Sequence, residues 1–128
     1  MLHSSPPPRV LLVDDDAALR TALSFSLELE GFQVDTLESG EALLLRSLPT
    51  ENACLVCDQN LPGVSGLEAI RQLRARGVVL PALLITSHPG PSVRAQAAAQ
   101  GVVIVEKPLL GDQLRAQIEA ALGLSPAP

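Results

Sequence analysis

The chain has 128 residues, a net charge of −5 and 47% hydrophobic residues, which predicts one folded domain with a hydrophobic core. The negative charge argues against direct binding of nucleic acid, which requires a clustered basic face. No apolar run approaches the roughly 20 residues of a membrane span, and residues 1–8 lack the pattern of a signal peptide. We therefore expect a cytoplasmic protein that does not contact a membrane.

Apolar runs of strand length alternate with helical patterns along the chain. The apolar runs predict five strands, at residues 10–14, 32–36, 53–57, 82–86 and 102–105. The helical patterns include residues 19–27, 41–48, 67–73, 92–100 and 114–122. Strands and helices that alternate in this way are typical of a parallel sheet with helices on both faces.

The strand at residues 32–36 alternates polar and apolar side chains, which predicts an edge strand. We therefore expect an α/β fold of the flavodoxin-like type, a five-stranded parallel sheet in the order 2-1-3-4-5 with five helices on both faces. Residues 9–123 form the domain in this interpretation. Residues 1–8 are a flexible leader, and residues 124–128 are a flexible tail or the start of a linker.

Three aspartates stand at the ends of predicted strands. Asp14 and Asp15 close the first apolar run, and Asp58 follows the third. In a sheet with this strand order, these ends are neighbours at the edge where ligands bind. Thr86 ends the fourth strand and Lys107 follows the fifth, so they belong to the same edge. The sequence therefore predicts a shared acidic pocket.

Two unit charges about 4 Å apart repel by about 4 kcal/mol at an effective dielectric of 20. Clustered carboxylates therefore need a counter-ion, and Mg²⁺ suits a site with one or two carboxylates and several retained waters. With the cation bound, Asp58 is a candidate nucleophile, since carboxylates that form aspartyl phosphates are an established class. Lys107 would supply positive charge to the phosphoryl oxygens, and Thr86 a hydroxyl donor.

Simpler structural roles compete with this interpretation. Asp14 or Asp15 alone would be an ordinary loop acid, and Asp16 has the position of a helix N-cap. Cys54 and Cys57 have the spacing of redox and zinc sites. On a strand, however, residues three apart point to opposite faces, so we expect two buried structural thiols. The joint placement of the polar residues at one sheet edge is what favours phosphoryl chemistry.

These residues also resemble the receiver domain of two-component response regulators. The resemblance rests on Asp14-Asp15, Asp58-Gln59-Asn60-Leu61-Pro62-Gly63-Val64-Ser65-Gly66, Thr86-Ser87 and Lys107-Pro108. It covers about residues 9–122. The segments around residues 85–88 and 105–108 look most like receivers of the nitrogen-fixation regulator type, which often carry a DNA-binding output domain.

The resemblance implies that Asp58 accepts a phosphoryl group from a sensor histidine kinase or a histidine phosphotransfer protein. It implies a Mg²⁺ site formed by Asp14, Asp15, Asp58 and the backbone carbonyl of Asn60, and a cis peptide bond before Pro108. Phosphorylation would switch the conformation and control a partner or output domain. A homodimer could form through the fourth helix, fifth strand and fifth helix. The chemistry would be limited to phosphorylation and dephosphorylation of the domain itself.

Two positions depart from the family pattern. Ile104 stands where receivers usually carry an aromatic residue, and Ser65 where an acidic residue is common. These departures leave open a pseudo-receiver that acts as a phosphorylation-independent binding module. Two roles stay open for His88. It positions or excludes the water that hydrolyses the acyl phosphate, or it is an ordinary polar loop residue. A dehalogenase-type hydrolase is disfavoured because its nucleophile would follow the first strand, and a nucleotide-binding module because no Gly-rich loop is present.

Overall fold

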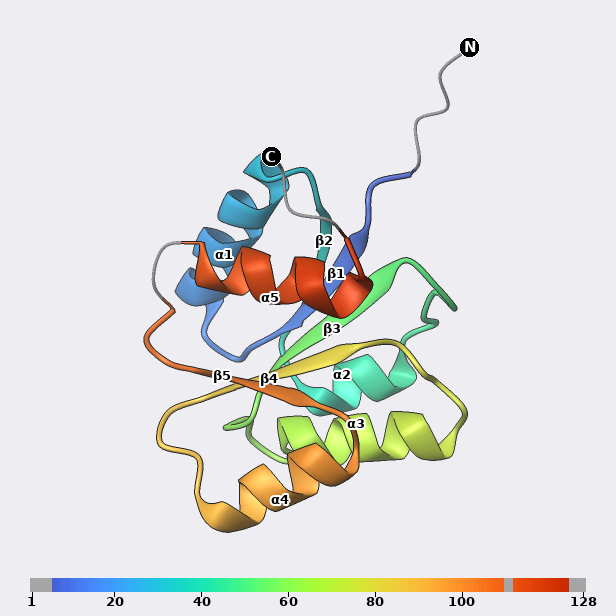
Figure 1. Cartoon of the computed structure of the whole chain (residues 1–128), viewed down its shortest axis with the longest axis vertical. Coiled ribbons are helices and arrows are strands. Elements are labelled where there is room, and N and C mark those ends of the chain that lie inside the picture. Colours follow the sequence, from blue (N-terminus) through green and yellow to red (C-terminus); the bar gives the residue numbers. More distant parts are fainter. Residues whose placement is uncertain (1–5, 110–111, 125–128) are drawn as a thin grey trace.

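The computed structural model describes residues 6–109 and 112–124 (Figure 1). The elements in chain order are β1 (Arg9–Val13), α1 (Ala17–Leu29), β2 (Gln33–Leu37), α2 (Gly40–Leu45), β3 (Ala53–Asp58), α3 (Gly66–Ala75), β4 (Ala82–Thr86), α4 (Pro91–Ala99), β5 (Val103–Glu106) and α5 (Gln113–Leu122). The strand order is β2-β1-β3-β4-β5, and all neighbouring strands are parallel. The predicted flavodoxin-like fold is confirmed. Of the predicted leader and tail, residues 1–5 and 125–128 lie outside the described residues.

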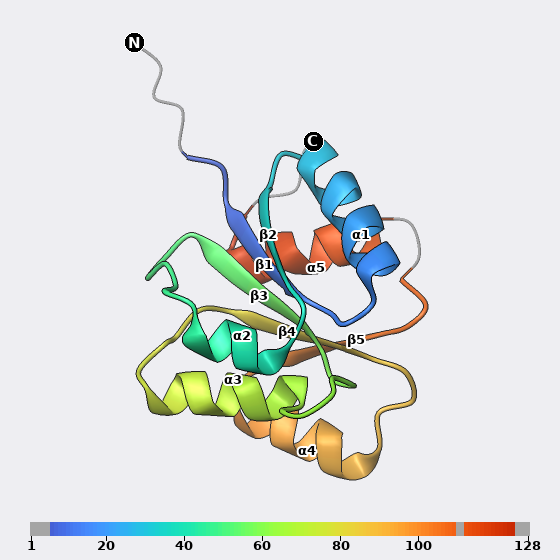
Figure 2. The same ribbon diagram turned by 180° about the vertical axis from the view of Figure 1, so that it is seen from behind.

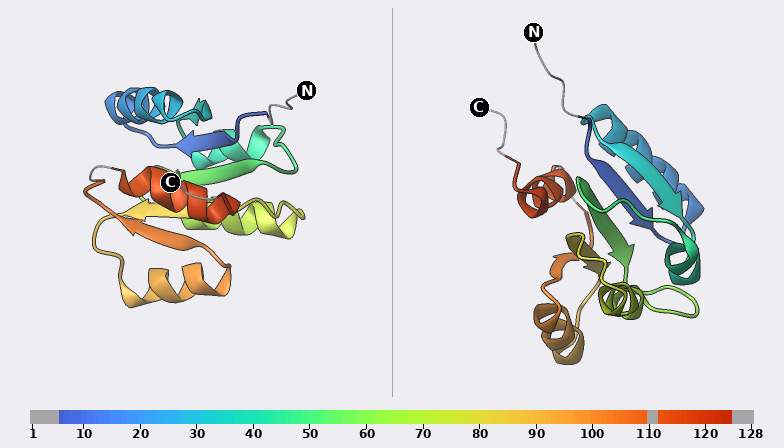
Figure 3. Two further views of the ribbon diagram at one scale, coloured as in Figure 1. Left: turned by 45° about the horizontal axis from the view of Figure 1, so that its top comes forward. Right: turned by 90° about the vertical axis from the view of Figure 1, so that its right-hand side faces the viewer.

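The sheet separates two hydrophobic clusters. One lies between the sheet and α2, α3 and α4 and includes Leu43 and Ile70, and the other lies against α1 and α5 and includes Leu27 and Ile118. In Figure 1 α5 lies in front of the strands, whereas in Figure 2, seen from behind, α2 and α3 do. Figure 3 shows the sheet between these layers. Every side chain of β3 and β4 is buried, which explains why both strands are continuous apolar runs.

Three helices begin with a side-chain cap directly after a loop at the carboxyl edge of the sheet. Asp16 accepts a hydrogen bond from the N–H of Leu19 at 3.1 Å, as its predicted N-cap role requires. Ser39 caps α2 at 3.0 Å and Ser65 caps α3 at 3.2 Å. Each cap satisfies an N–H group that the helix leaves unpaired. The caps therefore fix where the loops of the acidic edge end.

Some boundaries differ from the sequence prediction. α2 ends at Leu45 instead of residue 48, because Arg46 is extended with ψ 142° and the residue before Pro49 is biased away from helical backbone. The guanidinium of Arg46 reaches Asp35 at 2.8 Å instead. β1 begins and ends one residue earlier than predicted, β2 and β5 one residue later, and β3 extends through Asp58.

Gly66, the first residue of α3, lies directly against the end of β3. A Cβ atom added there would lie 2.3 Å from the carbonyl oxygen of Asp58. We expect Gly66→Ala to lower the free energy of unfolding by about 3 kcal/mol, because backbone must shift to relieve the overlap. Urea denaturation would measure this loss. Gly90→Ala is the matched control, since no atom lies within 4 Å of its added Cβ, and we expect it to cost less than about 1 kcal/mol. Equal losses in the two variants would contradict the steric explanation.

Candidate functional site

Asp14, Asp15 and Asp58 lie at the carboxyl ends of β1 and β3, which pair side by side. Each residue offers one carboxylate oxygen, and these oxygens lie within 4.8 Å of one another. Mg²⁺ holds its oxygen ligands at about 2.1 Å in octahedral geometry, so that the ligand atoms stand about 3 to 4 Å apart. The cluster therefore fits a divalent cation with only small movements of the side chains.

Asp14 has the least favourable surroundings in this cluster. Its side chain is buried, and Oδ1 accepts a hydrogen bond from the N–H of Asp16 at 2.9 Å. Oδ2 is buried without a hydrogen-bond partner in the described part of the chain. Burial raises the pKa of Asp14 and the charge of Asp58 raises it further, while the N–H of Asp16 partly offsets the rise. A bound cation would satisfy this unpaired oxygen.

Asp58 is 3% exposed and uses both carboxylate oxygens. Oδ1 accepts a hydrogen bond from the N–H of Asn60 at 2.9 Å, and Oδ2 accepts one from Nζ of Lys107 at 2.8 Å. Burial by itself lowers the pKa of Lys107, but the hydrogen bond and the charge of Asp58, with the other two aspartates, raise it overall. Lys107 is therefore a charged partner of Asp58 at neutral pH.

Thr86 ends β4 and is buried. Its carbonyl accepts the backbone N–H of Lys107 at 2.9 Å. Its hydroxyl donates to the carbonyl of Ser87 at 3.3 Å, which is a long contact for this kind of donor. No hydrogen bond between Thr86 and Asp58 is found among the described residues. The structure thus joins Asp58 directly to Lys107, and Thr86 to the backbone of Lys107. The peptide between Lys107 and Pro108 is cis, as the family resemblance implies.

Two side chains outside the predicted set of site residues hold the loop after Asp58. Oε1 of Gln59 accepts the N–H of Leu67 at 2.9 Å, and Oε2 of Glu41 accepts the N–H of Val64 at 3.0 Å. Gln59 directly follows Asp58, and this position was an available signal. Glu41 and Val64 are 23 residues apart, and no spacing rule connects them.

The two cysteines lie on opposite faces of the sheet, as predicted. Cys54 belongs to the cluster against α1 and α5, and Cys57 to the cluster against α2, α3 and α4. Both are buried and free, and burial raises the pKa of each thiol to about 12. They are therefore structural thiols and form neither a disulfide nor a shared metal site.

A groove of about 590 Å³ opens beside Lys107. It is lined by Leu19, Leu23, Ser87, His88, Lys107, Pro108 and Leu109. His88 is exposed and has a φ of 48°, which non-glycine residues seldom adopt. This location at the groove fits either role of His88, at the hydrolytic water or as an ordinary loop residue, and both roles stay predictions.

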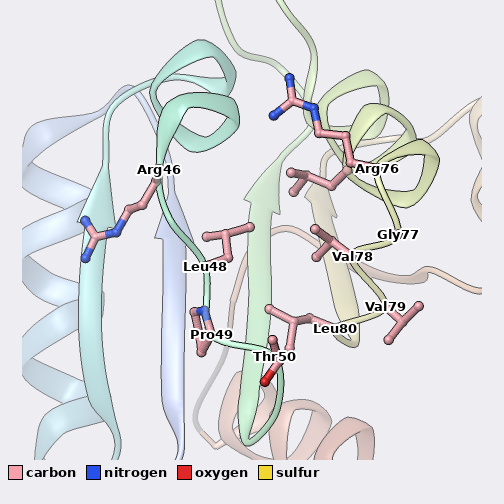
Figure 4. A pocket seen from close by; sticks show the side chains of 10 residues that line it. Arg46, Leu48, Pro49, Thr50, Arg76, Gly77, Val78, Val79 and Leu80 are labelled. Atoms are coloured by element: carbon pink, nitrogen blue, oxygen red, sulfur yellow. The ribbon is translucent and has the colours of Figure 1, made fainter.

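A separate pocket of about 320 Å³ lies between the ends of α2 and α3 (Figure 4). Its labelled lining includes Leu48, Val78 and Leu80, while the guanidinium of Arg46 points away from them toward β2. The guanidinium of Arg76 donates to the carbonyl of Leu44 at 2.6 Å. The pocket therefore presents mainly apolar side chains, and it contains none of the predicted site residues.

The comparison with known proteins decides the family. Residues 10–119 match the family described as response regulator receiver domain. The chain belongs to this family. As a receiver, it is 35% identical over 117 residues to the transcriptional regulatory protein FixJ of Azorhizobium caulinodans, a match that covers 91% of this chain and 56% of the relative. It is 36% identical over 118 residues to the phosphate regulon transcriptional regulatory protein PhoB of Rhizobium meliloti, which covers 90% and 52%.

The receiver also matches a crystal structure described as FixJ-N. The TM-score is 0.82 at 31% identity, with 94% of this chain and 98% of that chain covered. The FixJ matches confirm the resemblance to the nitrogen-fixation regulator type. This chain spans about half the length of the curated relatives it matches.

Membership in the family settles the general function. The chain is a receiver domain of two-component signal transduction with an acidic cluster typical of phosphoacceptor sites, and response regulators interact with histidine kinases. The comparisons give no support to the pseudo-receiver alternative. No helix in the described ranges has both the length and the apolar character that a membrane span needs.

The raised pKa of Asp14 predicts a pH-dependent cost in the metal-free receiver. A carboxyl group whose folded pKa is raised stabilises the fold below its ordinary value of 3.8, and this contribution is lost as the pH rises through the folded pKa. At pH 7 Asp14→Asn should therefore increase the free energy of unfolding by about 1 kcal/mol or more, the scale of one unpaired buried polar group. Denaturation in chelator at pH 7 and pH 4 would measure the gain.

The gain from Asp14→Asn should shrink at pH 4, because the wild-type carboxyl group takes up a proton as the pH falls through its folded pKa. Glu38→Gln is the control, since Glu38 is an exposed acid outside the cluster and should change little at either pH. A gain of the same size at both pH values would contradict the electrostatic explanation.

Proposed function

We propose that Asp58 is the phosphoacceptor of this receiver and that its donor is a phosphohistidine on a sensor histidine kinase or a histidine phosphotransfer protein. The location of Asp58 supports this assignment. It is a buried carboxylate at the end of β3, bonded to Lys107 at 2.8 Å, with carboxylate oxygens of Asp14 and Asp15 within 4.8 Å. A nucleophile that is positioned beside a cation and a metal site is suited to phosphoryl transfer.

In the transfer, a carboxylate oxygen of Asp58 attacks the phosphorus atom. An O–P bond forms, the P–N bond of the phosphohistidine breaks, and the imidazole keeps the electron pair of the broken bond. Lys107 exchanges its contact with Asp58 for one with a phosphoryl oxygen, where its charge offsets the charge of the transition state. The hydroxyl of Thr86, held by a long hydrogen bond, turns to another phosphoryl oxygen. We propose no enzymatic activity beyond this self-phosphorylation and the dephosphorylation of Asp58, in which water breaks the O–P bond and inorganic phosphate leaves.

We assign Asp14, Asp15, Asp58 and the backbone carbonyl of Asn60 to Mg²⁺. The unpaired Oδ2 of Asp14 and the all-oxygen donor set suit a hard divalent cation. When bound, Mg²⁺ would neutralise the clustered carboxylates and lower the charge that the incoming phosphoryl group meets. Asp14 could act through a metal-bound water.

The proposed partners follow from charge and from the relatives. With a net charge of −5, we propose that the domain itself binds neither nucleic acid nor membrane and acts in the cytoplasm. The matched FixJ and PhoB proteins are named transcriptional regulators and are longer than this chain. We propose that the receiver controls a partner or output domain of that kind.

A homodimer is proposed through the face formed by α4, β5 and α5. Val103 of the edge strand β5 is 46% exposed, and an exposed strand edge with an apolar side chain favours association. Arg94 on α4 lies 3.5 Å from Glu106 on β5, so the face carries both signs of charge.

Phosphorylation of Asp58 can be tested directly. We expect incubation with acetyl phosphate and Mg²⁺ to add one phosphoryl group. Hydroxylamine should remove it, because hydroxylamine is a nucleophile that cleaves the acyl phosphate formed on Asp58. Intact-mass spectrometry would show the addition, and a chelator should prevent it. Asp58→Asn should gain no mass. A full gain in that variant would overturn the assignment of the phosphoacceptor.

The response to phosphorylation should be small at β5. Ile104 is already half-buried against the cluster under α2, α3 and α4, and it has no polar tip that would lose a hydrogen bond. We expect beryllofluoride, a phosphoryl mimic, to shift amide resonances mainly at Thr86, at residues 88–91 and at the start of α4. Pro89 and Pro91 should limit the movement of that loop. Large shifts confined to α1 and α2 would contradict this prediction.

A further inference from the structure

The loop between β3 and α3, residues 59–65, touches the first turn of α2 at two glycines. A Cβ atom at Gly40 would lie 2.9 Å from the carbonyl oxygen of Val64, and one at Gly63 would lie 2.2 Å from Oε2 of Glu41. Gly63 has a φ of +75°, a conformation that glycine adopts without steric cost. The loop and the helix therefore approach more closely than residues with side chains would allow.

Glu41 forms the polar contact across this approach. Its Oε2 accepts the N–H of Val64 at 3.0 Å. The salt bridges found in the described residues do not include Glu41, so this hydrogen bond is the interaction that its carboxylate makes there. A carboxylate that accepts a backbone N–H makes a stronger bond than a neutral acceptor does.

The same loop carries residues of the acidic site. Asn60 donates its N–H to Oδ1 of Asp58, and its carbonyl is the proposed Mg²⁺ ligand. The start of the loop is held by the bond from the N–H of Gln59 to the carbonyl of Ile85 at 2.9 Å. In its second half Glu41 holds Val64, Ser65 caps α3, and the carbonyl of Gln59 accepts the N–H of Gly66 at 3.3 Å. The loop is thus fixed at both sides of the segment that presents Asn60.

We propose that Glu41 is a positioning residue for the Mg²⁺ site. By holding Val64, it keeps the loop in the shape in which the N–H of Asn60 contacts Asp58. Outer contacts that orient metal ligands raise metal affinity because less reorganisation accompanies binding. Glu41 therefore sets the Mg²⁺ concentration at which Asp58 becomes reactive. This inference rests on the proposed Mg²⁺-dependent function of Asp58.

A charge effect would be the competing explanation. Glu41 lies in the first turn of α2, where a negative charge stabilises a helix through its dipole, and it adds negative potential that attracts Mg²⁺. Glu41→Gln separates the two explanations, since glutamine keeps an oxygen acceptor for Val64 and loses the charge. Glu41→Ala removes both. Glu38→Ala is the matched control, because it removes an exposed acid just before α2 that makes no hydrogen bond among the described residues.

The experiment measures three quantities in the wild type and these variants. Hydrogen exchange of the Val64 amide without metal reports on the contact itself. Calorimetric titration gives the Kd for Mg²⁺, and phosphorylation by acetyl phosphate at saturating Mg²⁺ gives the rate once the site is filled. For Glu41→Ala we expect faster exchange at Val64, a Kd raised about tenfold, and a saturated rate close to that of the wild type. Glu41→Gln should retain most of the affinity, and Glu38→Ala should match the wild type.

Each other outcome overturns the inference in a distinct way. An unchanged Kd in a folded Glu41→Ala protein, verified by its melting temperature, removes the positioning role. Equal losses in Glu41→Ala and Glu41→Gln assign the effect to charge. A saturated rate that falls with the affinity assigns it to a general disturbance of the site. If the wild type itself binds no Mg²⁺, the proposed cofactor fails, whereas exchange at Val64 still reports whether Glu41 holds the loop.

Discussion

The repulsion among carboxylates at the ends of β1 and β3 is the constraint on which the rest of this receiver depends. The fold brings Asp14 and Asp58 to one point because their strands are adjacent, and it buries both side chains. Lys107 and the N–H of Asn60 offset the charge of Asp58. The N–H of Asp16 does so for one oxygen of Asp14 only. The negative charge that these contacts leave unbalanced can be neutralised by a bound cation. Binding of the cation therefore depends on the geometry of the loops.

The hydrophobic core supplies the rigidity that this arrangement requires. Side chains of β1, β3 and β4 are buried almost throughout, with helices packed on both faces of the sheet. Such a sheet holds the backbone at the strand ends in place, so the charged groups cannot separate by local relaxation without disturbing close-packed neighbours. The stability of the core therefore offsets the electrostatic cost of the site. The core lies between the sheet and the helices, whereas the charged site lies at the carboxyl edge of the sheet.

Much of the fold could be predicted from the sequence, because strand lengths, apolar runs and the alternation of strands with helices are local patterns. Asp58 and Lys107 could be placed at one edge because both follow parallel strands at their carboxyl ends, with only β4 between β3 and β5. The end of α2 was predicted three residues too late, because the helical pattern of residues 41–48 continues past Leu45, whereas the backbone of Arg46 is extended and its side chain reaches Asp35. Nor could the sequence say that the pKa of Asp14 is raised, since the rise comes mainly from the burial of its side chain.

The loops show why site geometry is harder to predict than site composition. The pairing of the strands determines where a residue at a strand end lies. The direction of a loop carbonyl depends instead on contacts such as the one between Glu41 and Val64, which are distant in the sequence. Phosphoryl transfer makes the same demand, since reacting groups must be aligned closely before reaction. Residues that hold the loops therefore act on the chemistry without touching the reacting atoms, and a motif that names only the acidic residues, the threonine and the lysine omits them.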